Sequence, residues 1–146
     1  MLGAGGAARS VAWALGDAGA ADIAIVNRTP AKAESAAELA GPQGRVGSAA
    51  DVGDADLVVN ATSLGMGAEP GAPGPLPLDP AALREGQIVV DLVYLPLETP
   101  LLAAARAAGA RPVDGLGMLV HQAARSIRRW TGVEPDLAVM AAAARA

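Results

Sequence analysis

The sequence predicts an α/β domain built on a doubly wound parallel sheet with flanking helices, and three observations predict it. First, apolar runs of strand length alternate along the chain with Ala-rich helical segments. Second, those runs are apolar on both faces, as in a sheet covered by helices on each side. Third, Gly3, Gly5 and Ala8 satisfy the G-x-G-x-x-G/A spacing of a dinucleotide-binding turn between a strand and a helix.

The N-terminal turn carries the residue types that such a turn requires. Gly3 lets the chain turn sharply out of a strand, and Gly5 lacks a Cβ, so the backbone can approach a pyrophosphate. Ala8 is small enough for the next helix to lie close to the sheet, and the N–H groups at the start of that helix face the phosphates. Only Met1 and Leu2 precede the turn, whereas a strand needs about five residues. We therefore expect a truncated first strand, with its two neighbours left unpaired at their facing edges.

Cap and stop signals divide the first half of the chain. Thr29 is placed as a helix cap with Pro30 at the first helical position, and Gly41-Pro42 ends that helix. The expected elements are a helix over 7–17, a strand over 22–26, a helix over 30–40, a short strand over 45–47, a turn or single helical turn at 51–54, and a strand over 56–60.

The second half continues the alternation without a repeat or a linker. Thr99-Pro100 caps a helix that Gly109 ends, and Thr131-Gly132 stops an amphipathic helix. The expected elements are a Gly- and Pro-rich loop over 62–79, a short helix over 80–84, a strand over 87–91, a helix over 99–108, a strand over 111–114, a helix over 118–130 and a final helix over 135–144. Residues 1–146 therefore form one domain.

Composition excludes several classes of protein. The net charge of −4 and the 2% aromatic content argue against a nucleic-acid surface with stacking platforms. No apolar run reaches the ~18–20 residues of a membrane span, and no secretory signal opens the chain. The absence of Cys removes disulfides and thiolate metal sites. We expect a cytoplasmic protein with neither a nucleic-acid nor a membrane partner.

The residues after the second expected strand point to the phosphorylated form of the cofactor. Asn27, Arg28, Thr29 and Lys32 lie where the fold places the adenosine ribose. An acidic residue is common there when the 2′-hydroxyl is bound, and this sequence has two cations instead. Arginine binds a 2′-phosphate through charge-assisted hydrogen bonds. The pattern favours NADP over NAD, and the alternative is a solvated helix start whose charges oppose the helix dipole.

Other candidates lie at the ends of later strands. Asn60 and Thr62 close a strand and are suited either to a nicotinamide ribose or to ordinary turn chemistry. Gly115 permits either close approach of a nicotinamide ring or a tight turn. Local evidence alone favours packing for Tyr94 and a surface position for Gln122. The lone histidine has no partners at ligand spacing, so no metal site is expected.

Taken together, the motifs resemble one family. In chain order they are GAGGAA, NRTxxKA, NATSLGM, DLVYxPxxTPLL, DGLGMLVxQ and WTGxxP. This series resembles the C-terminal, Rossmann-like NADP-binding domain of shikimate dehydrogenase, from Leu2 to about Leu137. The family is an NADP-dependent oxidoreductase of aromatic amino-acid biosynthesis that interconverts 3-dehydroshikimate and shikimate.

The resemblance implies a role for each matched residue. It implies that the turn at the N-terminus holds the pyrophosphate. The residues after the second strand would hold the adenosine and its 2′-phosphate, and the residues after the later strands would hold the nicotinamide half. The implied cofactor residues are Gly3, Ala4, Gly5, Gly6 and Ala7, then Asn27, Arg28, Thr29 and Lys32, then Asn60, Thr62, Leu92 and Gly115; Tyr94 and Gln122 reach toward shikimate.

The chain also departs from the family. By resemblance, a separate N-terminal domain binds most of the substrate and supplies a Lys–Asp pair for proton transfer. The only lysine here is Lys32, at the cofactor end, so no catalytic residue is expected in this chain. Reduction of a ketone makes an alkoxide that needs a proton donor. We expect an incomplete enzyme whose helices over 118–132 and 135–144 pack toward that domain and whose isolated chain is inactive. The expected protein partner is that domain or a second copy of the chain.

Three alternatives stay open. The chain is suited to a stand-alone NADP-binding module without catalysis, or to a quinate or shikimate dehydrogenase relative with altered substrate. A glutamyl-tRNA reductase-like domain is less favoured, because Tyr94 and Gln122 match the motifs that contact shikimate. A mis-placed gene start or a C-terminal piece would each account for the short first strand.

Overall fold

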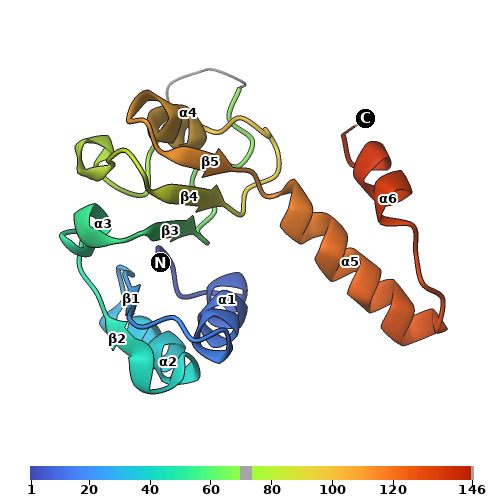
Figure 1. Ribbon diagram of the computed structural model, residues 1–146, viewed down its shortest axis with the longest axis horizontal. Helices are drawn as coiled ribbons and strands as arrows, with labels where there is room; N and C mark the ends of the chain where they lie inside the picture. The colour runs from blue at the N-terminus through green and yellow to red at the C-terminus, as the bar shows by residue number, and fades with distance from the viewer. Residues whose placement is uncertain (70–73, 146) are drawn as a thin grey trace.

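The computed structural model describes residues 1–69 and 74–145, and parallel strands form its centre. Strands β1 (Ile23–Ile25) and β2 (Gly44–Val46) pair as one sheet, and β3 (Leu57–Asn60), β4 (Ile88–Asp91) and β5 (Arg111–Val113) pair as another (Figure 1). Every strand pairing in the described chain is parallel. The predicted fold class, a Rossmann-like parallel sheet with flanking helices, is confirmed.

A remnant of a central strand joins the two sheets. Leu2 forms parallel bridges to Val26 on one side and to Asn60 on the other. The N–H of Leu2 donates to the Val59 carbonyl at 2.8 Å, and the N–H of Gly3 donates to the Val26 carbonyl at 2.8 Å. The first strand is therefore truncated, as predicted. The expectation of two fully unpaired edges was wrong, because Met1–Gly3 pairs with both neighbours at their carboxyl ends.

The two sheets enclose a cavity beside the residues that pair with Leu2. Its volume is ≈ 550 Å³, and it is lined mainly by the facing sides of β1 and β3 and by the residues that lead into them.

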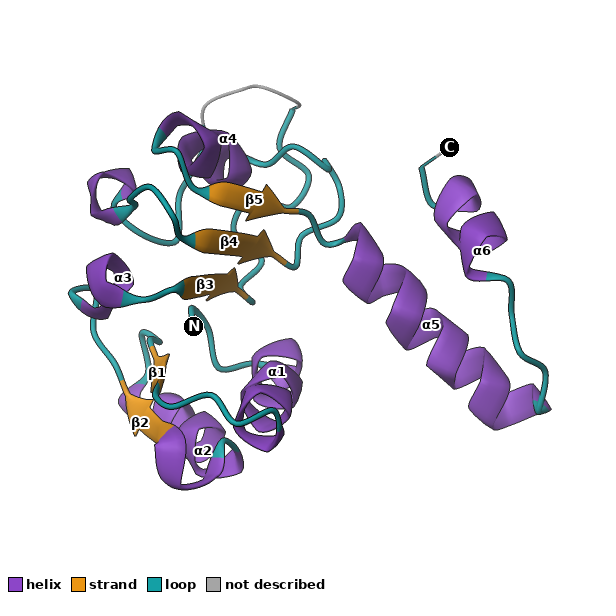
Figure 2. Ribbon diagram, in the orientation of Figure 1, coloured by secondary structure: helices purple, strands orange, loops and turns teal. Residues whose placement is uncertain are grey.

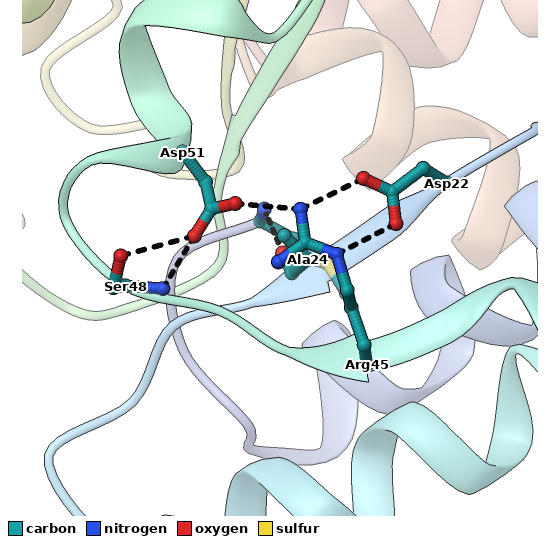
Figure 3. A network of polar contacts seen from close by, with 6 residues as sticks. Asp22, Ala24, Arg45, Ser48 and Asp51 are labelled. Carbon is teal, nitrogen blue, oxygen red and sulfur yellow. Dashed lines mark hydrogen bonds and ion pairs between the residues drawn. The ribbon is translucent and has the colours of Figure 1, made fainter.

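An ion-pair network, drawn in Figure 3, contributes three charged side chains to the lining of that cavity. Arg45 on β2 binds Asp22 through two bonds of 2.8 Å and binds Asp51 at 2.5 Å. Asp51 also accepts from the backbone N–H of Ser48 at 2.6 Å. Since Asp51 starts helix α3 (Asp51–Asp54), which leads into β3, the Arg45 guanidinium ties the two sheets together.

Helices flank the sheets, as Figure 2 shows. Helices α1 (Gly6–Asp17) and α2 (Pro30–Leu39) pack on each other beside β1 and β2. Helix α4 (Pro100–Ala107) covers β4 and β5, and two 3-10 turns, η1 (Gly41–Gln43) and η2 (Pro80–Ala82), lie in the connections. Fully buried alanines, Ala8, Ala12, Ala33 and Ala36, let the first two helices lie close to the strands.

Three predicted helices need correction, one of them the helix expected over 135–144, which is α6 (Leu137–Ala143) because Asp136 caps it. The short helix expected over 80–84 is the 3-10 turn Pro80–Ala82, because the side chain of Gln87 accepts from the N–H of Arg84 at 2.9 Å and draws the chain into β4. The helix expected over 118–130 is α5 (Leu116–Thr131), which begins two residues earlier. The carboxylate of Asp114 accepts from the N–H of Leu116 at 3.0 Å and supports this earlier start.

Helices α5 and α6 (Leu137–Ala143) form an arm that leaves the sheet (Figure 1). Trp130, Val133 and Val139 on this arm are 79%, 61% and 65% exposed. The apolar surface of the arm therefore lacks a covering layer in the described chain. No helix among the described residues combines the length and apolarity needed to cross a bilayer.

Candidate functional site

The carboxyl ends of the parallel strands gather the predicted site residues at one edge of the sheet. The turn after Leu2, the residues after β1, β3 and β5, and the end of β4 all reach this edge, because neighbouring strands run in the same direction. Ligands of open α/β sheets bind outside this edge. The fold thus brings the segments beginning at Gly3, Asn27, Asn60, Leu92 and Gly115 to a common edge.

The turn at the N-terminus requires glycine at its first position. Gly3 has a φ of +100°, and a Cβ there would lie 3.0 Å from the carbonyl oxygen of Ala61. Gly5 caps α1 without a side-chain hydrogen bond, and a Cβ on it would meet no atom within 4 Å. The first turn of α1, described in full, carries no acidic side chain. An exposed helix start with free N–H groups and no competing carboxylate is suited to an anion.

Two cations stand at the end of β1. Thr29 caps α2 and Pro30 takes its first helical position, as predicted, although the Thr29 hydroxyl makes no capping bond. Asn27 donates to the Thr29 carbonyl at 3.0 Å and shapes the turn. Arg28 and Lys32 are exposed, and neither takes part in an ion pair among the described residues. Both charges are therefore available to an anionic ligand.

A buried polar network lies at the ends of β3 and β4. Asn60 and Asp91 are both 0% exposed, and the Asn60 amide donates to the Asp91 carboxylate at 2.9 Å. The amide oxygen of Asn60 accepts from the N–H of Thr62 at 3.0 Å and from its hydroxyl at 2.7 Å. The Asn60 side chain is thus engaged within the protein, where it shapes the loop that follows β3.

Asp91 and Thr99 are the other two members of this network, which sequence analysis did not predict. Thr99 donates to Asp91 at 2.7 Å and caps α4 by accepting from the N–H of Leu102 at 3.3 Å. The capping role of Thr99 was predicted and is confirmed. Only the pairing of strands brings Asp91 to Asn60, so no local pattern identifies the network.

The glycine after β5 is required by a backbone contact. A Cβ on Gly115 would lie 2.6 Å from the carbonyl oxygens of both Leu92 and Val93. Sequence reasoning left two roles open for this glycine, close approach of a nicotinamide ring or a tight turn, and the structure shows that it also lies close to the chain that follows β4. Gly115 thereby fixes where Leu92, which is half-buried, lies relative to the start of α5.

The two residues expected to reach the substrate are at the surface. Tyr94 is 42% exposed, and Gln122 is exposed on α5, where its amide donates to the Leu119 carbonyl of the same helix at 3.2 Å. His121 is also exposed. Over residues 1–69 and 74–145, no three acidic or histidine side chains gather as metal ligands.

Several known proteins that resemble this chain are named as shikimate dehydrogenases. The family model described as Shikimate 5'-dehydrogenase C-terminal domain matches residues 115–145. A shikimate dehydrogenase (NADP(+)) from Mesorhizobium japonicum is 50% identical over 141 residues, covering 94% of this chain and 49% of that protein. The chain spans about half the length of the curated relatives it matches.

Solved structures agree with the sequence matches. Shikimate 5-dehydrogenase from Thermus thermophilus, in complex with NADP(H) and shikimate, superposes with a TM-score of 0.86 at 43% identity, covering 99% of this chain and 52% of that one. Quinate dehydrogenase from Corynebacterium glutamicum, in complex with NAD, superposes with a TM-score of 0.80 at 38% identity, covering 95% and 51%.

The fold and the glycine turn define this molecule as a Rossmann-like domain of the class found in dinucleotide-dependent oxidoreductases. Both the sequence matches and the superpositions cover nearly the whole chain. The chain belongs to the shikimate dehydrogenase family, of which it corresponds to the C-terminal part.

Proposed function

We propose that this domain binds NADP(H) and forms the cofactor half of an enzyme that interconverts 3-dehydroshikimate and shikimate. The observation that carries the proposal is the pair of exposed cations, Arg28 and Lys32, which lack ion-pair partners in the described chain and follow β1, beside a glycine turn with φ +100° at Gly3. The relatives are named as NADP(+) enzymes, and one solved relative holds both NADP(H) and shikimate. A reaction of this biosynthetic kind is expected in the cytoplasm.

The residues of the edge fit an extended dinucleotide phosphate. The open space above Gly5 and the N–H groups of α1 would hold the pyrophosphate. Arg28 and Lys32, with Asn27 and Thr29, would hold the adenosine and its 2′-phosphate. Bound there, NADPH supplies the hydride for ketone reduction. The proposed cofactor residues are Gly3, Ala4, Gly5, Gly6, Ala7, Asn27, Arg28, Thr29, Lys32, Asn60, Thr62, Leu92 and Gly115.

Substrate contact from this half would come from two exposed side chains. The hydroxyl of Tyr94 and the amide of Gln122 are free to turn toward a polyhydroxylated acid, since Gln122 is held only by one 3.2 Å bond within its own helix. Lys32 is the only lysine and is committed to the cofactor end. We therefore propose that this chain by itself binds the cofactor without turning over substrate, because the resemblance assigns proton transfer to a lysine–aspartate pair and the one lysine here serves the cofactor end.

The helical arm is the proposed contact for the substrate-binding half. The proposed contact is formed by residues 118–132 and 135–144. The arm carries the exposed apolar side chains Trp130, Val133 and Val139. Apolar surface of this kind is typical of a protein interface.

The proposal is tested by titrating the purified chain with NADPH and NADH and by assaying NADP-dependent oxidation of shikimate and of quinate. We expect saturable NADPH binding, weaker NADH binding and no turnover of either acid. Absence of NADPH binding would refute the cofactor assignment, and turnover by the isolated chain would refute the assignment of proton transfer to another domain.

A further inference from the structure

The carboxylate of Asp91 is the most deeply buried charged group at the carboxyl edge. It is 0% exposed, and no ion pair in the described parts of the chain includes it. Its neighbours are neutral donors: the Asn60 amide at 2.9 Å, the Val93 N–H at 3.0 Å and the Thr99 hydroxyl at 2.7 Å. Burying a charge is costly unless donors replace water, and three donors do so here.

On the β3 side, Asp91 decides which way the Asn60 amide points. A carboxylate only accepts hydrogen bonds, so the amide nitrogen of Asn60 faces it. The amide oxygen must then face the loop, where the N–H and hydroxyl of Thr62 donate to it. The Thr62 hydroxyl in turn accepts from the N–H of Leu64 at 3.2 Å. One carboxylate thus orders the segment 60–64.

On the β4 side, the same carboxylate sets the turn that carries Leu92 and Tyr94. The oxygen that accepts from Asn60 also accepts from the N–H of Val93. The carbonyl groups of Leu92 and Val93 lie close to Gly115, because a Cβ on Gly115 would be 2.6 Å from each carbonyl oxygen. Asp91 therefore fixes two loops and the start of α5 relative to one another.

We propose that Asp91 is a positioning residue for the nicotinamide half of the dinucleotide. It touches no ligand from its buried position, and it acts by holding the 60–64 and 92–94 segments in one arrangement. The adenosine half, at Arg28 and Lys32, lies at the end of β1 on the other sheet and is independent of the Asp91 carboxylate. This inference rests on the proposed function, and it predicts that the two halves of the cofactor respond differently to substitution of Asp91.

The test compares NADPH with 2′,5′-ADP, which carries the adenosine and 2′-phosphate but no nicotinamide. In Asp91→Ala we expect the Kd for NADPH to rise about tenfold and the Kd for 2′,5′-ADP to change less than about twofold. Asp91→Asn should raise the Kd for NADPH by only about threefold, since its amide oxygen can still accept from Asn60 and Val93 while the Thr99 hydroxyl turns to accept. Thr99→Val is the matched control, because it removes a bond to Asp91 without touching Asn60 or Val93; it should lower Tm and leave the ratio of the two Kd values unchanged.

The other possible results of these titrations also support or refute the positioning role of Asp91. Equal losses for both ligands, or an unchanged NADPH Kd, in a folded Asp91 variant would overturn the positioning role. If Asp91→Ala does not fold, Asp91→Asn carries the test: a rise of about threefold for NADPH alone supports the role, and an unchanged ratio refutes it. If the unaltered chain binds neither ligand, the proposed function itself fails and this role fails with it, a result distinct from equal losses in a variant.

Discussion

Arg28→Asp tests the cofactor preference of this domain most sharply. Arg28 is exposed at the start of α2 and is free of ion pairs in the described structure, so the substitution breaks no intramolecular ion pair there. An acidic residue at a helix N-terminus also interacts favourably with the helix dipole. We therefore expect the variant to be at least as stable as the unaltered chain, and any loss of affinity to be local.

The magnitude follows from the charges involved. A charge-assisted hydrogen bond from arginine to a phosphate contributes about 1.5–3 kcal/mol, and solvent exposure favours the lower end. The new carboxylate repels the 2′-phosphate, which adds about 1 kcal/mol at a water-exposed site. With the lower end of the range, the sum is about 2.5 kcal/mol, which corresponds to a Kd for NADPH raised roughly 70-fold. NADH lacks the 2′-phosphate, so its Kd should change by less than about threefold.

Calorimetric titration of both cofactors measures this difference. Arg125→Asp is a suitable control, because Arg125 is exposed on the separate arm helix α5 and the substitution changes the net charge by the same amount. The control should leave both affinities unchanged at moderate salt, where distant charges are screened. Equal losses of NADPH and NADH in Arg28→Asp, or no loss of NADPH, would refute the assignment of Arg28 to the 2′-phosphate.

Two further predictions concern stability. Arg45 holds the pKa of Asp51 at about 2, mainly through their hydrogen bond, so this pair stabilises the fold above the ordinary pKa of Asp, about 3.9, and the contribution is lost as pH falls through about 2. Arg45→Met should flatten the acid limb of the urea-unfolding free energy between about pH 4 and pH 2; an unchanged limb would contradict the role of the network. Gly3→Ala should lower the unfolding free energy by about 1–3 kcal/mol because of its positive φ and its contact with the Ala61 carbonyl. Gly6→Ala, where a Cβ meets open space, should not lower it, and equal effects in the two variants would count against the strain argument.

Local signals predicted most of the secondary structure. The Thr-Pro pairs at Thr29 and Thr99 both mark helix starts, because cap chemistry acts within one turn of the chain. The short helix over 80–84 was predicted too long, because the end of this 3-10 turn depends on Gln87, which lies outside the segment. The start of α5 was placed two residues late because Gly115 is set by Leu92 and Val93, which only the folded chain brings near.

Part of the candidate site could also be predicted from the sequence, and part of it could not. The Gly3 turn and the cations at 28 and 32 could be predicted, since spacing and charge along one segment define them. The Asp91 network could not, because its central bond joins residues 31 positions apart. Nor could sequence reasoning show that Leu2 alone would pair with both neighbouring strands, since each partner lies on a different sheet.

The affinity of the unaltered chain for NADPH relative to NADH bears most directly on this account. Titration of the folded 146-residue chain should give saturable binding of NADPH with a Kd at least about tenfold below that of NADH, the separation that one exposed phosphate contact provides. Equal affinities for the two cofactors, or no binding of NADPH, would contradict the proposal that this domain binds NADP(H).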